Sequence, residues 1–258
     1  MSRVPAAEKK IEAVTLLACA RFYRVAEALF APNIDLCQLL EKVTGRQCAL
    51  MPRGVDTVAF SPEYRSRTGE EFVLGFCGRL SIEKNVFLLA RIRTELLALG
   101  ITNFRFLIVG HGKEEGWLRE HLPNAEFTGV LRGHDLARAY ANMDLFVFPS
   151  HTDTFGNVVL EAFASGVPAI VTPDGGPASI VRDGVTGRIV PDGEFAAAVA
   201  GILAEPAKLA EMRSAARAHA LTASWDSVFE GVYAAYEGIL PGAGAERGVA
   251  VSAEAKAI

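Results

Sequence analysis

The chain has 258 residues, half of them hydrophobic, and a formal net charge of −4. This length suits one large domain or one and a half smaller ones, and the mild acidity gives no reason to expect nucleic acid as a partner. No apolar run approaches the roughly 20 residues of a membrane span. The four cysteines have no CxxC spacing, so they predict reduced core thiols in a cytoplasmic protein.

The first part of the chain predicts two helices and a short strand. Apolar residues follow a helical spacing over 11–29 and predict one helix there, ended by Pro32. A second helix is predicted over 35–44, closed by Gly45. Residues 48–51 then predict a strand.

Strands and helices alternate from residue 72 onward. The predicted strands are 72–76, 104–109, 126–128, 145–148, 168–171 and 188–190. The predicted helices run from after Asn85 to about 99, and over 114–121, 135–141, 156–164, 193–204, 206–219 and 225–239. This alternation predicts an α/β fold, a Rossmann-like parallel sheet with helices on both faces.

The stretch 149–168 is the part around which the chain is organised. Together with the apolar strands on either side, it forms a strand–loop–helix–strand unit. The loop of this unit falls at the carboxyl end of a strand, where open α/β sheets bind ligands. The N–H groups at the start of its helix predict an anion site for phosphate. The residues predicted to contact the ligand there are Phe155, Gly156, Asn157 and Val158.

Two carboxylates, Asp153 and Glu161, belong to the same unit. An acid beside a phosphate pocket repels phosphate, so these side chains should face neutral groups, and sugar hydroxyls fit because a carboxylate can accept two of them. The alternative is an N-cap aspartate and a solvated helix glutamate.

A second group of residues follows the strand 72–76. Gly78 allows close approach of a ligand, and Arg79 and Lys84 could hold a diphosphate between them. The alternative is two solvated surface cations with Glu83 as an ion-pair partner.

The pattern Asp153-x-Phe-Gly-(four residues)-Glu161-Ala-x-Ala-x-Gly-x-Pro resembles the signature of the retaining glycosyltransferases of family 4, which have the GT-B fold. The family usually has Glu where this chain has Asp153. The resemblance covers about residues 12–240 and includes Arg-Gly-Val-Asp at 53–56, which is similar to the family's interdomain linker. It implies that Arg79 and Lys84 hold the donor diphosphate, Asp153 the donor sugar and Glu161 the ribose. It also implies that the backbone at Val130 contacts the base.

The same resemblance implies a domain organisation. Residues 1–52 would be a remnant of an acceptor-side N-terminal domain, 53–71 the linker, 72–224 the nucleotide-sugar-binding domain, 225–240 a C-terminal helix and 241–258 a disordered tail. On the order of 150 residues of the first domain would be missing, which makes this a truncated form of the family.

The implied activity is transfer of a hexose from a nucleotide-diphosphate sugar, GDP-mannose narrowly over UDP-glucose, with retention. The acceptor would be a saccharide or a lipid, and a lipid-linked acceptor would bring the chain into peripheral contact with a membrane. No Asp-x-Asp or His cluster indicates a metal, so no metal or other cofactor is expected. The alternatives are an inactive nucleotide-sugar-binding fragment and a nucleotide-sugar isomerase. A dinucleotide oxidoreductase is a further alternative, but the absence of GxGxxG after the first strand argues against it.

Overall fold

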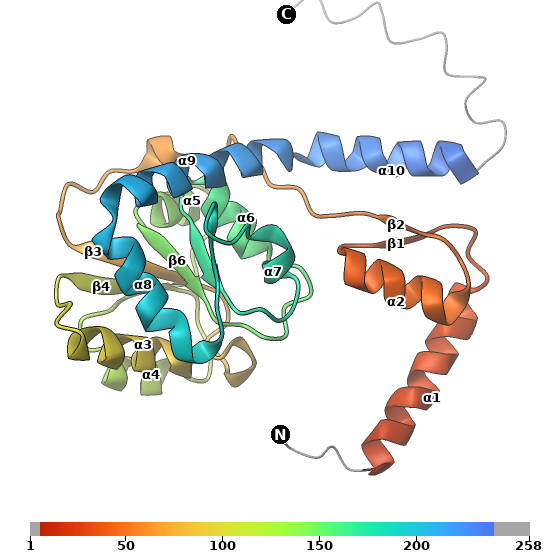
Figure 1. Cartoon of the computed structure of the whole chain (residues 1–258), viewed down its shortest axis with the longest axis horizontal. Helices are drawn as coiled ribbons and strands as arrows, with labels where there is room; N and C mark the ends of the chain where they lie inside the picture. The colour runs from red at the N-terminus through yellow and green to blue at the C-terminus, as the bar shows by residue number, and fades with distance from the viewer. Residues whose placement is uncertain (1–5, 240–258) are drawn as a thin grey trace, which may run out of the picture. The chain divides into compact units, whose positions relative to one another are not determined.

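The computed structural model describes residues 6–239 (Figure 1), so the predicted disordered tail lies outside the described residues. The chain divides into two compact units. One is made of residues 1–52 and 226–258, and the other of residues 53–225.

The smaller unit contains a pair of short parallel strands. Leu29 of β1 (Leu29–Ala31) pairs with Cys48 of β2 (Cys48–Leu50), and the ring of Phe30 contacts that of Tyr236, with centroids 5.2 Å apart. Its elements are α1 (Ala6–Tyr23), β1 (Leu29–Ala31), α2 (Ile34–Thr44), β2 (Cys48–Leu50) and, from its second residue on, α10 (Trp225–Ile239).

The predicted single helix over 11–29 is wrong at its carboxyl end. Helix α1 stops at Tyr23, and Leu29 belongs to a strand. Pairing with β2, a partner distant in sequence, overrides the helical spacing of the apolar residues. The prediction for α2 is confirmed: its amino end is capped by Asn33, and Gly45 follows it with φ of 68°.

The larger unit is built on a six-stranded parallel sheet in the order β5-β4-β3-β6-β7-β8. Its strands are β3 (Phe72–Cys77), β4 (Phe104–Val109), β5 (Glu126–Gly129), β6 (Leu145–Phe148), β7 (Ala169–Val171) and β8 (Gly187–Ile189). Its helices are α3 (Phe87–Ala98), α4 (Glu115–His121), α5 (Gly133–Ala141), α6 (Asn157–Ala164), α7 (Pro177–Ile180), α8 (Phe195–Ala204) and α9 (Pro206–Thr222), with 3-10 turns at Pro62–Tyr64, Ile82–Lys84 and Asp192–Glu194. The short helix α7 stands where only a turn was predicted.

Helices cover both faces of this sheet, as predicted. Helices α3, α4 and α8 lie on one face, and α5, α6 and α9 lie on the other (Figure 1). The strands β3, β6 and β7 are accordingly apolar along their whole length, and all four residues of β6 are buried.

The strand order reverses at the centre of the sheet. The chain moves outward in one direction from β3 through β4 to β5, then returns to β6 on the other side of β3 and continues outward to β8. The loops that follow β3 and β6 therefore diverge at neighbouring positions on the carboxyl edge. Such a switch point leaves a crevice in which open α/β sheets bind ligands.

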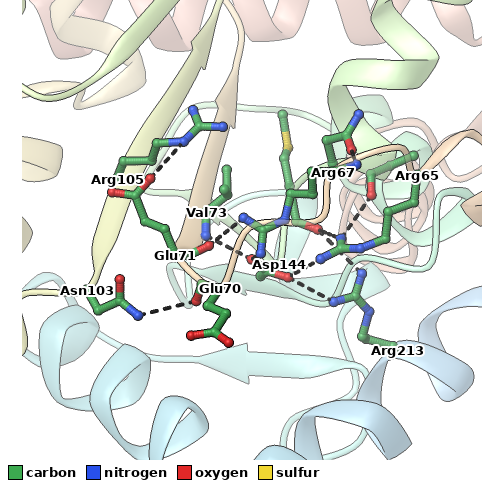
Figure 2. A network of polar contacts seen from close by, with 12 residues as sticks. Arg65, Arg67, Glu70, Glu71, Val73, Asn103, Arg105, Asp144 and Arg213 are labelled. Atoms are coloured by element: carbon green, nitrogen blue, oxygen red, sulfur yellow. Dashed lines mark hydrogen bonds and ion pairs between the residues drawn. The ribbon is translucent and has the colours of Figure 1, made fainter.

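At the opposite edge of the sheet, one carboxylate anchors residues 53–71 to the strands. Asp144, just before β6, accepts from Arg65 Nη2 at 2.6 Å and Arg67 Nη2 at 2.7 Å, and Arg213 Nη1 of α9 lies 3.1 Å away (Figure 2). Asp144 Oδ2, which faces Arg67, also accepts from the N–H of Val73 at 2.9 Å. The group fixes the amino ends of β3 and β6, and so the strands that carry the crevice.

Candidate functional site

A cavity of about 230 Å³ opens at the switch point between β3 and β6. Its lining comes from the residues before β3, the ends of β3 and β6, and the loops after them. The lining residues are Arg53, Cys77, Gly78, Lys84, Phe148, Asp153, Thr154, Phe155, Gly156, Asn157 and Val158. The structure thus brings seven of the predicted site residues to one cavity: Gly78, Lys84, Asp153, Phe155, Gly156, Asn157 and Val158.

An ion pair joins the two loops across this cavity. Lys84 Nζ lies 2.5 Å from Asp153 Oδ2, and both side chains are largely shielded, at 21% and 24% exposed. The same ammonium group lies 5.9 Å from the centre of the Phe148 ring. A second link comes from the Thr152 hydroxyl, which donates to the carbonyl of Glu83. The cation and the carboxylate therefore hold each other in place at the cavity.

The amino end of helix α6 forms part of the cavity wall. Gly156 precedes the helix with φ of 94° and supplies no side-chain cap. A Cβ at this position would also lie only 2.8 Å from Pro177 Cγ, so a glycine is required on both counts. The positive end of the helix dipole faces the cavity without a carboxylate cap of its own, an arrangement that suits an anionic ligand.

A second cavity, of about 320 Å³, shares Cys77 and Gly78 with the first. Its lining is mainly apolar and contains the predicted residues Arg79 and Val130 together with Val109, Gly110, His111, Leu131 and Leu136. Gly110 packs so closely on Gly78, the residue after β3, that a Cβ at position 110 would lie 1.9 Å from the Gly78 carbonyl oxygen. A flat apolar group such as a nucleobase fits this composition.

Arg79 lies apart from the Lys84–Asp153 pair. Its guanidinium is 3.1 Å from Glu83 Oε1, and the side chain is 71% exposed. The alternative to a ligand role, an ion pair with Glu83, therefore exists in this structure, although Arg79 still lines the second cavity.

Glu161 lines neither cavity and sits among buried groups beside them. Burial raises the pKa of its carboxyl, and the Tyr140 hydroxyl offsets the rise in part. Burial also raises the pKa of the Cys77 thiol to about 12, with a further contribution from the Glu161 charge. Glu161 is thus close to Cys77, which forms part of both cavity walls.

His151 connects three further loops at the same edge. Its Nδ1 lies 2.8 Å from Asp174 and its Nε2 lies 3.0 Å from Asp192. Asp192 in turn accepts from the amide of Asn85, the residue after Lys84. Partial burial lowers the pKa of His151, but the two carboxylates outweigh this and raise the pKa above its ordinary value.

Four residues of the first cavity were not predicted: Arg53, Cys77, Phe148 and Thr154. Sequence position could have indicated Cys77 and Phe148, because each ends a predicted strand next to a predicted loop. Within residues 6–239, no group of three or more His, Cys, Asp or Glu side chains could hold a metal ion. Among these same residues, no helix has the length and apolar character to cross a membrane.

Comparisons with known proteins agree on the family and the fold. The family model for glycosyl transferases group 1 matches residues 71–205. A GDP-mannose-dependent alpha-mannosyltransferase of Mycobacterium tuberculosis is 35% identical over 84% of this chain and 58% of its own length. One of Corynebacterium glutamicum is 42% identical over 48% of this chain and 31% of its own length.

Solved structures show the same architecture. Sucrose-phosphate synthase from Thermosynechococcus elongatus superposes with a TM-score of 0.77 at 23% identity, covering 87% of this chain and 61% of that one. Anabaena HepE in complex with UDP-glucose superposes with a TM-score of 0.73 at 20% identity, over 87% of this chain and 68% of that one. The predicted fold class, a Rossmann-like parallel sheet of the GT-B type, is confirmed. The chain spans only 31% and 58% of the two mannosyltransferases.

Proposed function

Because the chain belongs to the group 1 glycosyltransferases, we propose that it binds a nucleotide-diphosphate sugar and transfers the hexose to a saccharide or lipid acceptor. The observation that carries this proposal is the Lys84–Asp153 pair beside the amino end of α6, in one cavity at the switch point. A ligand that carries both phosphates and hydroxyls would satisfy all three groups.

The chemistry assigns a different task to each group. As the sugar–phosphate bond ionises towards an oxocarbenium-like state, charge grows on the departing diphosphate. Lys84 and the N–H groups of α6 would stabilise that charge where it develops. Asp153 would hold the sugar hydroxyls, and Glu161 the ribose. Arg79 can leave Glu83 for a phosphate at little cost, because an exposed ion pair is worth only about 0–1 kcal/mol.

The donor that we propose is GDP-mannose, with UDP-glucose as the second choice. Support comes from the names of the relatives, since several are GDP-mannose-dependent mannosyltransferases. Retention of configuration and membership of family 4 rest on the motif around Asp153 and Glu161. We place the activity in the cytoplasm, with peripheral membrane contact when the acceptor is a lipid.

Calorimetry with GDP, UDP and ADP tests the site. We expect binding of one of the first two and a loss of at least about tenfold in both Lys84→Ala and Glu161→Ala, because a hydrogen bond to a charged group contributes roughly 1.5–3 kcal/mol. Lys208→Ala changes an exposed lysine of α9 and is the matched control. Binding in both site variants equal to that of the parent would show that the site is misplaced.

The second candidate function is binding without transfer, because the predicted site residues that line the two cavities are all ones assigned to the donor. A turnover assay with intact GDP-mannose and UDP-glucose separates the two. Nucleotide binding with neither transfer nor donor hydrolysis would establish the binding module in place of the enzyme.

A further inference from the structure

Arg53 occupies a position that its neighbours fix firmly. The next residue, Gly54, packs so tightly on Trp225 that a Cβ would lie 2.7 Å from its atoms. The N–H of Val55 donates to the carbonyl of Ala223 at 2.9 Å, and the Val55 side chain is buried. The backbone that presents Arg53 is therefore held against the end of α9, although the arginine itself is exposed.

Three cations lie around the two cavities, and they differ in what they already bind. Lys84 is paired with Asp153 and Arg79 with Glu83. Arg53 lines the Lys84 cavity, and among the described residues its side chain has neither an ion-pair nor a hydrogen-bond partner. It is the one cation of the three that can take up an anion without first giving up a carboxylate.

We infer that Arg53 is a binding residue for the donor diphosphate, supplied by the segment that precedes the sheet. This inference rests on the proposed function and adds a third cation to it. The planar guanidinium can engage phosphate oxygens in a fork, whereas the Lys84 ammonium acts as a point charge. Arg53, Lys84 and the amino end of α6 together surround the cavity with positive charge, of which Asp153 neutralises only part.

The test is calorimetric titration of the whole chain with GDP and UDP at two salt concentrations. Arg53→Gln is expected to lower the affinity for the nucleoside diphosphate that the parent binds by about tenfold or more. Its affinity should also fall less steeply with added salt, because one exposed charge contact is gone. Arg53→Lys keeps the charge but not the fork, so it should recover part of the affinity.

Two comparisons make the result decisive. Arg138→Gln removes an exposed arginine of α5 that lines neither cavity, and it should bind as the parent does. Equal melting temperatures of the Arg53 variants and the parent show that the effect lies in binding. Parent-like affinity in Arg53→Gln, with binding lost in Lys84→Ala, would overturn the role of Arg53 and leave the proposed function standing. A parent that binds neither GDP nor UDP would overturn the proposed function itself.

Discussion

Glu161 is an acidic side chain that the fold keeps largely away from water. Because its pKa is raised in the folded protein, the folded state holds the proton to a higher pH than the unfolded chain does. The destabilising effect of its charge therefore begins above the unfolded pKa and is complete above the folded one. A group retained at such a cost at the side of two cavities is a functional candidate.

Replacing Glu161 by Gln should separate stability from binding. At pH 8 we expect the variant to melt on the order of 2 °C higher than the parent. This advantage should shrink as the pH falls through the raised pKa, while nucleotide affinity is lost at every pH. Thermal unfolding between pH 4 and 8 measures the difference in melting temperature, with Glu211→Gln on the exposed side of α9 as control. An advantage that grows on acidification would contradict the burial of this charge.

Gly156 links backbone conformation to the ligand site. Gly156→Ala should destabilise the protein both through the left-handed conformation, worth about 1–2 kcal/mol, and through the clash with Pro177. It should also weaken nucleotide binding, because the start of α6 must shift. Gly100→Ala is the matched control, since Gly100 has φ of 79° and nothing within 4 Å of a Cβ. Equal urea stability in the two variants would show that the Pro177 contact does not matter.

At the level of single residues, sequence patterns identified which polar side chains belong to the candidate site, but not which residues each of them contacts. The motif predicted Lys84 and Asp153 for one site, and the topology places them 2.5 Å apart. The sequence indicates Arg53 only as part of a linker, because the position of this residue depends on Gly54 packing against Trp225, far away in the sequence. No local pattern reports such a contact.

Among the elements, the segment before β3 is secured by the carboxylate of Asp144 and the arginines around it (Figure 2). Asp144 is only 6% exposed, so Asp144→Asn should leave several guanidinium groups poorly paired. We expect a loss of about 3–5 kcal/mol in the free energy of unfolding. Urea unfolding followed by circular dichroism measures this change.

The control for that variant is an exposed ion pair of similar geometry. Arg91 and Glu95 on α3 are 2.6 Å apart but open to solvent, and Glu95→Gln should cost less than about 0.5 kcal/mol. If Asp144→Asn costs no more than Glu95→Gln, the anchor contributes nothing to stability beyond a surface pair.

Helices and strands were predictable where the residues of the element itself carry the hydrophobic pattern. Strands β3, β6 and β7 are short apolar runs, and the structure places all six strands of the large sheet within a residue or two of their predictions. Strand β1 was missed because three residues carry no pattern of their own and acquire a conformation only by pairing with β2. Helix α7, of four residues, is too short for a helical period to show.

For the molecule as a whole, the main hydrophobic core belongs to one of the two units. Every residue of that core falls between Val55 and Ala220, and the lining of both cavities falls between Arg53 and Val158. A unit with its own core and its own site has what an independent domain requires. The sequence could place this domain by its strand–helix alternation, but it could not show that α9 completes the core.

A fragment of residues 53–225 should therefore fold and bind nucleotide by itself. We expect one cooperative thermal transition and an affinity for GDP or UDP within about twofold of the whole chain, because a self-contained domain keeps its site. A fragment of residues 53–205 is the matched control: it lacks α9, whose Met212, Ala216 and Ala220 are buried in the core. It should show no cooperative transition, since removing a helix leaves a large apolar face without cover. If the longer fragment also lacks a transition while the whole chain has one, residues 1–52 and 226–258 are needed for this core to form, and the two units fold as one.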